Sequence, residues 1–140
     1  LHGISATHAN LQPVSSFKTY ISSIRNVPEG QSIGYGRKSY TTRSSRIAVI
    51  PVGYADGLNR HLSNRVGNVF IKGKRVPIIG NICMDTCMID VTDTNATIGD
   101  EVEIFGKHIL VTELSEQLGT IPYEILTGIS HRVKRVYYKE

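Results

Sequence analysis

Short runs of apolar, mostly β-branched residues recur along the chain at intervals of about ten residues, and this spacing restricts the possible folds more than any other feature. The segment 45–53 (SRIAVIPVG) ends at glycine, and 69–79 (VFIKGKRVPII) is divided at Lys72-Gly73-Lys74, which is typical of a tight hairpin. Two more runs follow at 87–91 and 101–105, separated by turn residues. Strands of this length and spacing predict a β-sandwich or a β-barrel.

Helix signals occur only near the C-terminus. Thr112 is a candidate N-cap for a helix that ends at Gly119, and Pro122 suits the first position of a second short helix that ends at Gly128. We therefore expect a mainly β fold, a closed or partly open barrel with two short helices near the C-terminus. Three further segments have the composition of strands: 14–27, 108–111 and 132–139.

The composition is that of an ordinary globular domain, with 40% hydrophobic and 20% charged residues among 140. It argues against disorder and against a coiled coil, and the length favours one domain with a self-sufficient core. The apolar runs are far shorter than the roughly 20 residues that cross a bilayer, and two cysteines do not make a disulfide framework. We expect a cytoplasmic protein with no membrane partner and no visible signal peptide.

Two tyrosines lie between glycines, in Gly34-Tyr35-Gly36 and in the segment 53–57 (GYADG), which contains Tyr54. Glycine on both sides lets the backbone turn sharply and leaves the ring uncrowded, so the phenol can project toward a ligand. The same spacing also fits a plain turn beside a core tyrosine. Spacing alone leaves both interpretations open.

The segment 81–85 (NICMD) follows a glycine and could offer backbone N–H groups to an anion at the end of a strand. It fits an ordinary strand core equally well, with Cys83 and Cys87 as space-filling side chains. These cysteines are four residues apart, and no second cysteine pair or closely spaced histidine pair completes a zinc site. We therefore predict no metal.

Basic residues form three small groups, and the chain carries seven tyrosines and a net charge of +4. On a small β-barrel this combination is compatible with a nucleic-acid surface, and it is also typical of a solvated surface of mixed charge. Because the net charge is modest, we expect no nucleic-acid partner. The groups are Arg37, Lys38, Arg43 and Arg46; Lys72, Lys74 and Arg75; and Arg132, Lys134 and Arg135.

Five motifs span nearly the whole chain: PEG (28–30), GYG (34–36), PVGYADG (51–57) with Arg60, CMD (83–85) and IPYE (121–124). Together they resemble the C-terminal β domain of the pyridoxal-phosphate-dependent alanine racemases, and GYADG followed by CMD is the most specific pair. The opening residues 1–4 (LHGI) resemble the end of the barrel domain that precedes this β domain in the family. We therefore expect residues 1–10 to form the domain junction and residues 11–140 to form one β domain.

The resemblance implies that the preceding barrel domain carries the lysine that binds pyridoxal 5′-phosphate, and that the β domain supplies a second acid/base group. In this chain that group would be Tyr35, which would exchange a proton on one face of the substrate carbon. The backbone of Met84 would help to hold the carboxylate of alanine, and Tyr123 would hydrogen-bond the cofactor phosphate. Three residues match positions in the entrance corridor: Tyr54, Arg60 and Ile121.

The resemblance also implies a head-to-tail homodimer of full-length chains that supplies D-alanine for peptidoglycan, with each β domain covering the partner's barrel. The chain without the cofactor lysine is expected to be inactive alone. Asn81 stands where some members carry Arg, which puts the charge of the corridor in question. Two alternatives stay open: a non-catalytic dimerisation or appended module, and a basic β-barrel that binds nucleic acid. Substrate breadth beyond alanine also stays open.

Overall fold

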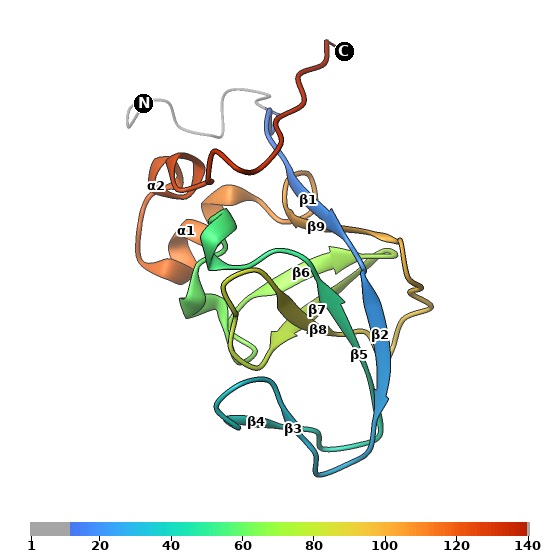
Figure 1. The fold of residues 1–140 in the computed structure, drawn as a ribbon. Coiled ribbons are helices and arrows are strands. Elements are labelled where there is room, and N and C mark those ends of the chain that lie inside the picture. The colour runs from blue at the N-terminus through green and yellow to red at the C-terminus, as the bar shows by residue number, and fades with distance from the viewer. Residues whose placement is uncertain (1–11, 140) are drawn as a thin grey trace.

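The computed structural model describes residues 12–139 (Figure 1), and the expected domain junction at residues 1–10 lies outside this range. These residues form strands and four short helices, two of which are 3-10 helices (η). In chain order the elements are β1 (Phe17–Tyr20), β2 (Ser23–Val27), β3 (Ser32–Ile33), β4 (Ser39–Tyr40), β5 (Ser45–Ile50), η1 (Tyr54–Asp56), η2 (Arg60–Leu62), β6 (Asn68–Ile71), β7 (Lys74–Ile79), β8 (Cys87–Asp90), β9 (Glu101–Phe105), α1 (Val111–Leu118) and α2 (Pro122–Thr127).

Seven strands form one curled antiparallel sheet in the order β1-β9-β6-β7-β8-β5-β2, and β3 and β4 form a separate hairpin. The two edge strands, β1 and β2, are consecutive in the chain and are joined through Ile21 and Ser22. The Ile21 N–H donates to the Asp100 carbonyl (3.0 Å), and the Ser22 N–H donates to the Val49 carbonyl (2.9 Å). The sheet is therefore a partly open barrel whose two edges are linked by the chain itself, which confirms the predicted fold class.

The prediction of one strand over 14–27 is wrong in one respect, because this segment forms two strands with different partners. Residues of β1 pair with β9, and residues of β2 pair with β5. Ile21 is completely buried between them. β1 and β2 lie at opposite ends of the strand order, so the segment passes from one edge of the curled sheet to the other at Ile21.

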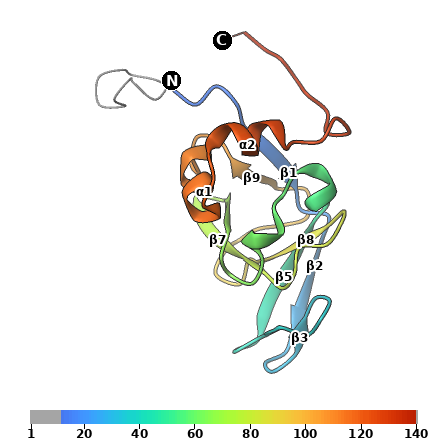
Figure 2. The same cartoon turned by 90° about the vertical axis from the view of Figure 1, so that its left-hand side faces the viewer.

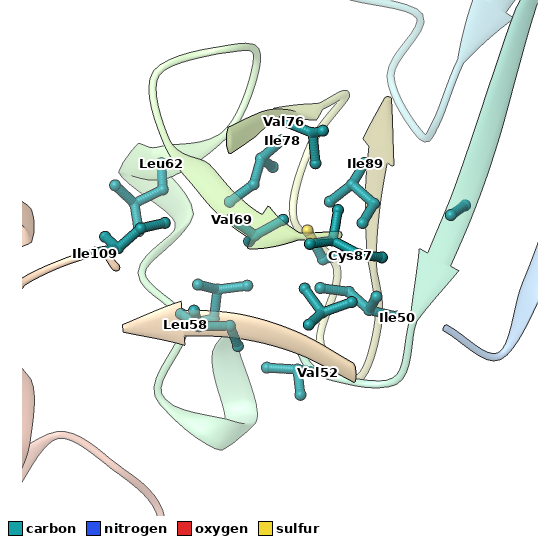
Figure 3. Close-up of a cluster of buried hydrophobic side chains, with 14 of the residues drawn as sticks. Ile50, Val52, Leu58, Leu62, Val69, Val76, Ile78, Cys87, Ile89 and Ile109 are labelled. Carbon is teal, nitrogen blue, oxygen red and sulfur yellow. The ribbon is translucent and has the colours of Figure 1, made fainter. Parts of the chain in front are cut away.

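The core lies inside the curled sheet and follows the alternation of side chains along the strands (Figure 3). In β8, Cys87 and Ile89 are buried and their neighbours are only partly so, and in β6 the inward positions include Val69. Ile50 comes from β5 and points into the same cluster. Each such side chain stabilises the fold by about 1.5–3 kcal/mol when it is fully buried.

The hairpin predicted around Lys72-Gly73 is confirmed. Lys72 and Gly73 form the two-residue connection between β6 and β7, with φ angles of 48° and 78°. Positive φ at both central residues is the geometry of the type I′ turn, whose twist matches that of the two strands. Glycine is favoured at the second position because it adopts positive φ without the steric cost that other residues bear.

A second, smaller apolar cluster lies on the other face of the sheet. Ile47 and Ile79 point outward from β5 and β7, and Val27 and Met88 pack beside them. Ile33 from β3 completes this cluster. The β3–β4 hairpin is thereby held against the outside of the sheet, and it projects below the sheet in Figures 1 and 2.

The two predicted helices are present and end where glycine was expected. Gly119 follows α1 with φ 65°, and Pro122 opens α2, which Gly128 ends. Leu114 of α1 is buried in the main core. The N-cap of α1 is Leu110 and not Thr112 as predicted, because the helix already begins at Val111.

Two strand predictions are wrong. Residues 108–110 bend before α1, since the buried carboxylate of Glu103 accepts hydrogen bonds from the N–H groups of His108 (2.7 Å) and Ile109 (3.1 Å) and turns the chain. Residues 132–139 contain no strand, although Val and Tyr are frequent there. The end of this tail runs away from the sheet (Figure 1). Val136, Tyr137 and Tyr138 are exposed, and strand composition without a partner strand does not make a strand.

Candidate functional site

Tyr35 lies at the tip of the β3–β4 hairpin, and 72% of its surface is exposed. Both flanking glycines have positive φ, 73° at Gly34 and 87° at Gly36. A Cβ atom at Gly34 would lie 2.7 Å from the Met88 methyl group, so a larger residue would have to displace this flexible side chain and would also be strained by the positive φ. Of the two sequence interpretations, the plain turn beside a core tyrosine is wrong: the phenol is presented to the surface.

The backbone of this tip is bound to the loop between β7 and β8. The side-chain amide of Asn81, at the start of that loop, donates to the carbonyl oxygen of Tyr35 (2.8 Å). Three residues later the loop reaches Met84, which is 54% exposed. Two of the residues singled out from sequence are therefore placed by the same loop.

The same loop also carries the first 3-10 helix. The N–H of Tyr54 donates to the Cys83 carbonyl and the N–H of Ala55 donates to the Met84 carbonyl, both at 3.0 Å. A Cβ atom at Gly53 would lie 2.3 Å from each of these carbonyl oxygens. Glycine at position 53 is therefore required for η1 to lie directly on the loop.

Arg132 joins these two segments through their aspartates. Its Nε atom donates to Asp56 and its terminal nitrogen donates to Asp85, both at 2.7 Å. Burial alone would raise the pKa of Asp56, but the hydrogen bonds from Arg132 and from the Gly53 N–H lower it below its ordinary value. The two carboxylates in turn raise the pKa of Arg132. Neither motif predicts this bridge, although each of them contains an aspartate.

The remaining predicted residues lie beside the 3-10 helices and at the start of α2. The guanidinium carbon of Arg60 is 5.9 Å from the centre of the Tyr54 ring, within range of a cation–π contact. Ile121 is the N-cap of α2 and Tyr123 lies in its first turn, and both are about half exposed. The β3–β4 hairpin, the 3-10 helices and α2 lie along the left-hand side of the molecule in Figure 1, which faces the viewer in Figure 2.

A pocket of about 370 Å³ lies between the 3-10 helices and the helix pair α1–α2. Leu58 and Leu114 are among its apolar walls, and its polar lining residues are Tyr54, Asn59, Arg60, Thr120 and Glu124. Tyr35 and Met84 do not line it. The structure therefore brings Tyr54 and Arg60 together at this pocket. It places Tyr35 at the tip of the β3–β4 hairpin and Met84 in the loop between β7 and β8, outside the pocket.

Other chemistry considered from the sequence has little support in residues 12–139. Burial raises the pKa of the Cys87 thiol to about 12, so this thiol is a core group. Within the described range, histidine, cysteine and acidic residues do not gather in threes that could hold a metal ion. No helix among these residues is long and apolar enough to cross a membrane.

Comparison with known proteins identifies the family. Residues 14–137 match the family described as "Alanine racemase, C-terminal domain". The chain is 51% identical over 133 residues to alanine racemase 2 of Caldanaerobacter subterraneus subsp. tengcongensis. The aligned region covers 91% of this chain and 34% of that protein.

Solved structures give the same result. The biosynthetic alanine racemase of Pseudomonas aeruginosa superposes with a TM-score of 0.89 at 34% identity, over 99% of this chain and 39% of that one. The alanine racemase of Bartonella henselae with covalently bound pyridoxal phosphate gives 0.84 at 38% identity, over 88% and 34%. This chain thus spans about a third of the length of the relatives it matches. It belongs to the family of alanine racemase C-terminal domains.

Proposed function

We propose that this chain is the part of an alanine racemase that supplies the tyrosine acid/base and the substrate-gating residues for the pyridoxal-phosphate-dependent interconversion of L- and D-alanine. The observation that carries this proposal is the exposed phenol of Tyr35, held by its backbone to the loop that contains Met84. A dimerisation module would not need a phenol presented between two glycines of positive φ.

Inversion at a carbon atom needs a proton donor or acceptor on each of its two faces. Pyridoxal phosphate, when bound, withdraws electrons from the substrate α-carbon and so makes its proton acidic. We assign one face to Tyr35, whose hydroxyl would hold or release the proton, and the other face to the cofactor lysine of the preceding barrel domain. A phenol in water keeps its proton up to about pH 10, so cationic neighbours from that barrel would assist the transfer at neutral pH.

The residues on this face suit the remaining tasks. Within residues 12–139, the carbonyl of Met84 accepts from Ala55, while the Met84 N–H donates to no backbone carbonyl and is available to a substrate carboxylate. The exposed hydroxyl of Tyr123 is of the right chemistry to donate to a cofactor phosphate oxygen. Tyr54, Arg60 and Ile121 would lie along the entrance corridor, which Tyr35 and Tyr123 would narrow.

The assembly is proposed from the resemblance to the racemase family. We propose a homodimer in which Tyr35 serves the cofactor of the partner subunit, in a cytoplasmic enzyme that provides D-alanine for peptidoglycan. The basic groups give little support to nucleic-acid binding, because several of their members are already paired: Arg43 with Asp93, Arg75 with Glu113, and Arg132 with Asp56 and Asp85.

The test is Tyr35→Phe in the full-length enzyme, with α-proton exchange measured separately from L-alanine and from D-alanine. We expect removal of the proton from one enantiomer to be impaired much more than from the other, because only one face loses its acid/base group. Tyr40→Phe is the matched control, since it removes an exposed hydroxyl from the same hairpin. The 140-residue chain alone should not racemise alanine. Equal, small losses in both directions would remove Tyr35 from the proposed role.

A further inference from the structure

A line of three hydrogen bonds begins and ends on the hairpin that carries Tyr35. The Ser39 hydroxyl of β4 donates to Asn64 Oδ1 (2.8 Å), Asn64 Nδ2 donates to Asn81 Oδ1 (2.9 Å), and Asn81 Nδ2 donates to the Tyr35 carbonyl (2.8 Å). Asn81 is only 9% exposed. Three segments that are distant in the sequence are thereby joined around one buried amide.

The orientation of both amides in this line follows from its last acceptor. The carbonyl of Tyr35 can only accept, so the atom of Asn81 that faces it must be the amide nitrogen. The other side-chain atom of Asn81, Oδ1, then has to accept, so the atom of Asn64 that faces it must be the amide nitrogen Nδ2. Asn64 Oδ1 is left to accept the hydrogen bond from the Ser39 hydroxyl. Each group has one role, and the loss of a single donor breaks the line at a known point.

The middle of the line is held in an uncommon backbone conformation. Asn64 has φ 56° and the next residue, Arg65, has φ 71°. The N–H groups of these residues donate to the carbonyls of Gly80 (3.0 Å) and Ile78 (2.7 Å). Positive φ is disfavoured for residues other than glycine and persists where the surroundings fix it. Asn64 is thus fixed against the end of β7, directly beside Asn81.

The hairpin itself gives Tyr35 little support. Its strands have two residues each, and the pairing ends at Ile33 and Ser39, before the tip begins. A Cβ atom at Gly36 would lie 3.1 Å from Asn81 Nδ2, so the glycine leaves room for the amide beneath the tip. The apolar cluster with Ile33 holds the base of the hairpin, and the hydrogen bond from Asn81 joins the backbone of residue 35 itself to the loop.

We propose that Asn81 is a positioning residue for Tyr35: its buried amide sets the height and direction of the tip, so that the phenol meets the substrate carbon. This inference rests on the proposed function of Tyr35. Because Asn81 and Met84 belong to one loop, the same segment also sets the distance from the phenol to the proposed carboxylate contact. Asn81 would act through Tyr35 and would not touch the substrate.

The test is Asn81→Asp in the full-length enzyme with its cofactor. Ionised aspartate keeps the shape of the side chain and the oxygen that accepts from Asn64, but it has no proton to donate to Tyr35, so the measurements are made at a pH well above the aspartate pKa. Hydrogen exchange, followed by mass spectrometry of peptides that cover residues 32–40, should become at least about tenfold faster, because a carbonyl loses its donor and faces a carboxylate. Peptides from β8 and β9 should keep their exchange rates.

The kinetic result should separate positioning from general damage. We expect kcat to fall mainly in the direction that Tyr35→Phe also impairs, with KM for alanine changed less than about twofold. Asn64→Asp is the milder second variant: it removes the donor to Asn81 but leaves the bond to Tyr35, so the same changes should be smaller. It carries the test should the Asn81→Asp enzyme fail to fold.

The results that would contradict the role of Asn81 differ from the result that would contradict the proposed function. Unchanged exchange over residues 32–40, or equal losses in both directions together with a raised KM, would overturn the role of Asn81 while Tyr35→Phe still shows its asymmetry. A fully active Tyr35→Phe enzyme would overturn the proposed function itself, whatever the result at Asn81.

Discussion

Replacement of Gly53 by alanine should destabilise the domain more than replacement of any glycine whose missing Cβ faces open space. The position has an extended backbone, with φ −139°, so alanine is not excluded by conformation. The obstacle is contact: the new Cβ atom would lie 2.3 Å from the carbonyl oxygens of Cys83 and Met84, and real Cβ atoms do not come closer than about 3.0 Å. Both oxygens accept backbone hydrogen bonds from η1.

The size of the effect follows from two contributions. Forcing a methyl group into a packed site costs about 1–3 kcal/mol. The backbone must then move apart, which weakens two hydrogen bonds of about 0.5–1.5 kcal/mol each. Together these give a loss of about 2–6 kcal/mol in the free energy of unfolding.

Urea unfolding of the chain, followed by circular dichroism, measures this loss. With a denaturant slope of about 2 kcal/mol per molar, a change of about 3 kcal/mol lowers the midpoint by about 1.5 M. Gly119→Ala is the control, because its Cβ would meet nothing within 4 Å and only the left-handed φ of 65° opposes it, at about 1–2 kcal/mol. A Gly53→Ala midpoint equal to or above that of Gly119→Ala would refute the reasoning.

Two further predictions concern titrating groups. Iodoacetamide at pH 8 should modify partly exposed Cys83 and leave Cys87 intact until urea is added, because burial raises the Cys87 pKa to about 12; equal native labelling rates would contradict this. Burial opposes the charge of Glu103, but N–H groups of the turn after β9 outweigh it and hold its pKa below the ordinary value. The charge of Glu103 therefore stabilises the fold fully above about pH 4.3, and this contribution to the free energy of unfolding disappears as the pH falls through the folded-state pKa. Between about pH 5 and 3 the urea midpoint of Glu103→Gln should therefore fall less steeply than that of the unsubstituted chain.

The sequence predicts those parts of the fold whose signals are local. The hairpin at Lys72-Gly73 and the helix ends at Gly119 and Gly128 each follow from residues within one turn of the backbone. The strand at 132–139 fails because a strand also needs a partner, and composition does not say whether one is within reach. The division of 14–27 at Ile21 likewise depends on where the sheet edges meet.

The candidate site divides in the same way. Glycines around Tyr35 showed that the ring can be presented, but its exposure depends on the apolar cluster under the hairpin. The contacts made by Arg132 span 76 and 47 residues, and that of Asn81 with Tyr35 spans 46. No motif connects positions so far apart, so both residues emerge only when the chain is folded.

The loop between β7 and β8 has a consequence for how this domain works within a larger assembly. The hairpin tip and η1 both rest on this loop, through Asn81 and through the carbonyls of Cys83 and Met84. A rotation of the whole domain carries all three segments as one rigid body and leaves their mutual spacing unchanged. In the homodimer that we propose, a change in the docking angle between subunits would therefore leave the spacing between these three segments unaltered.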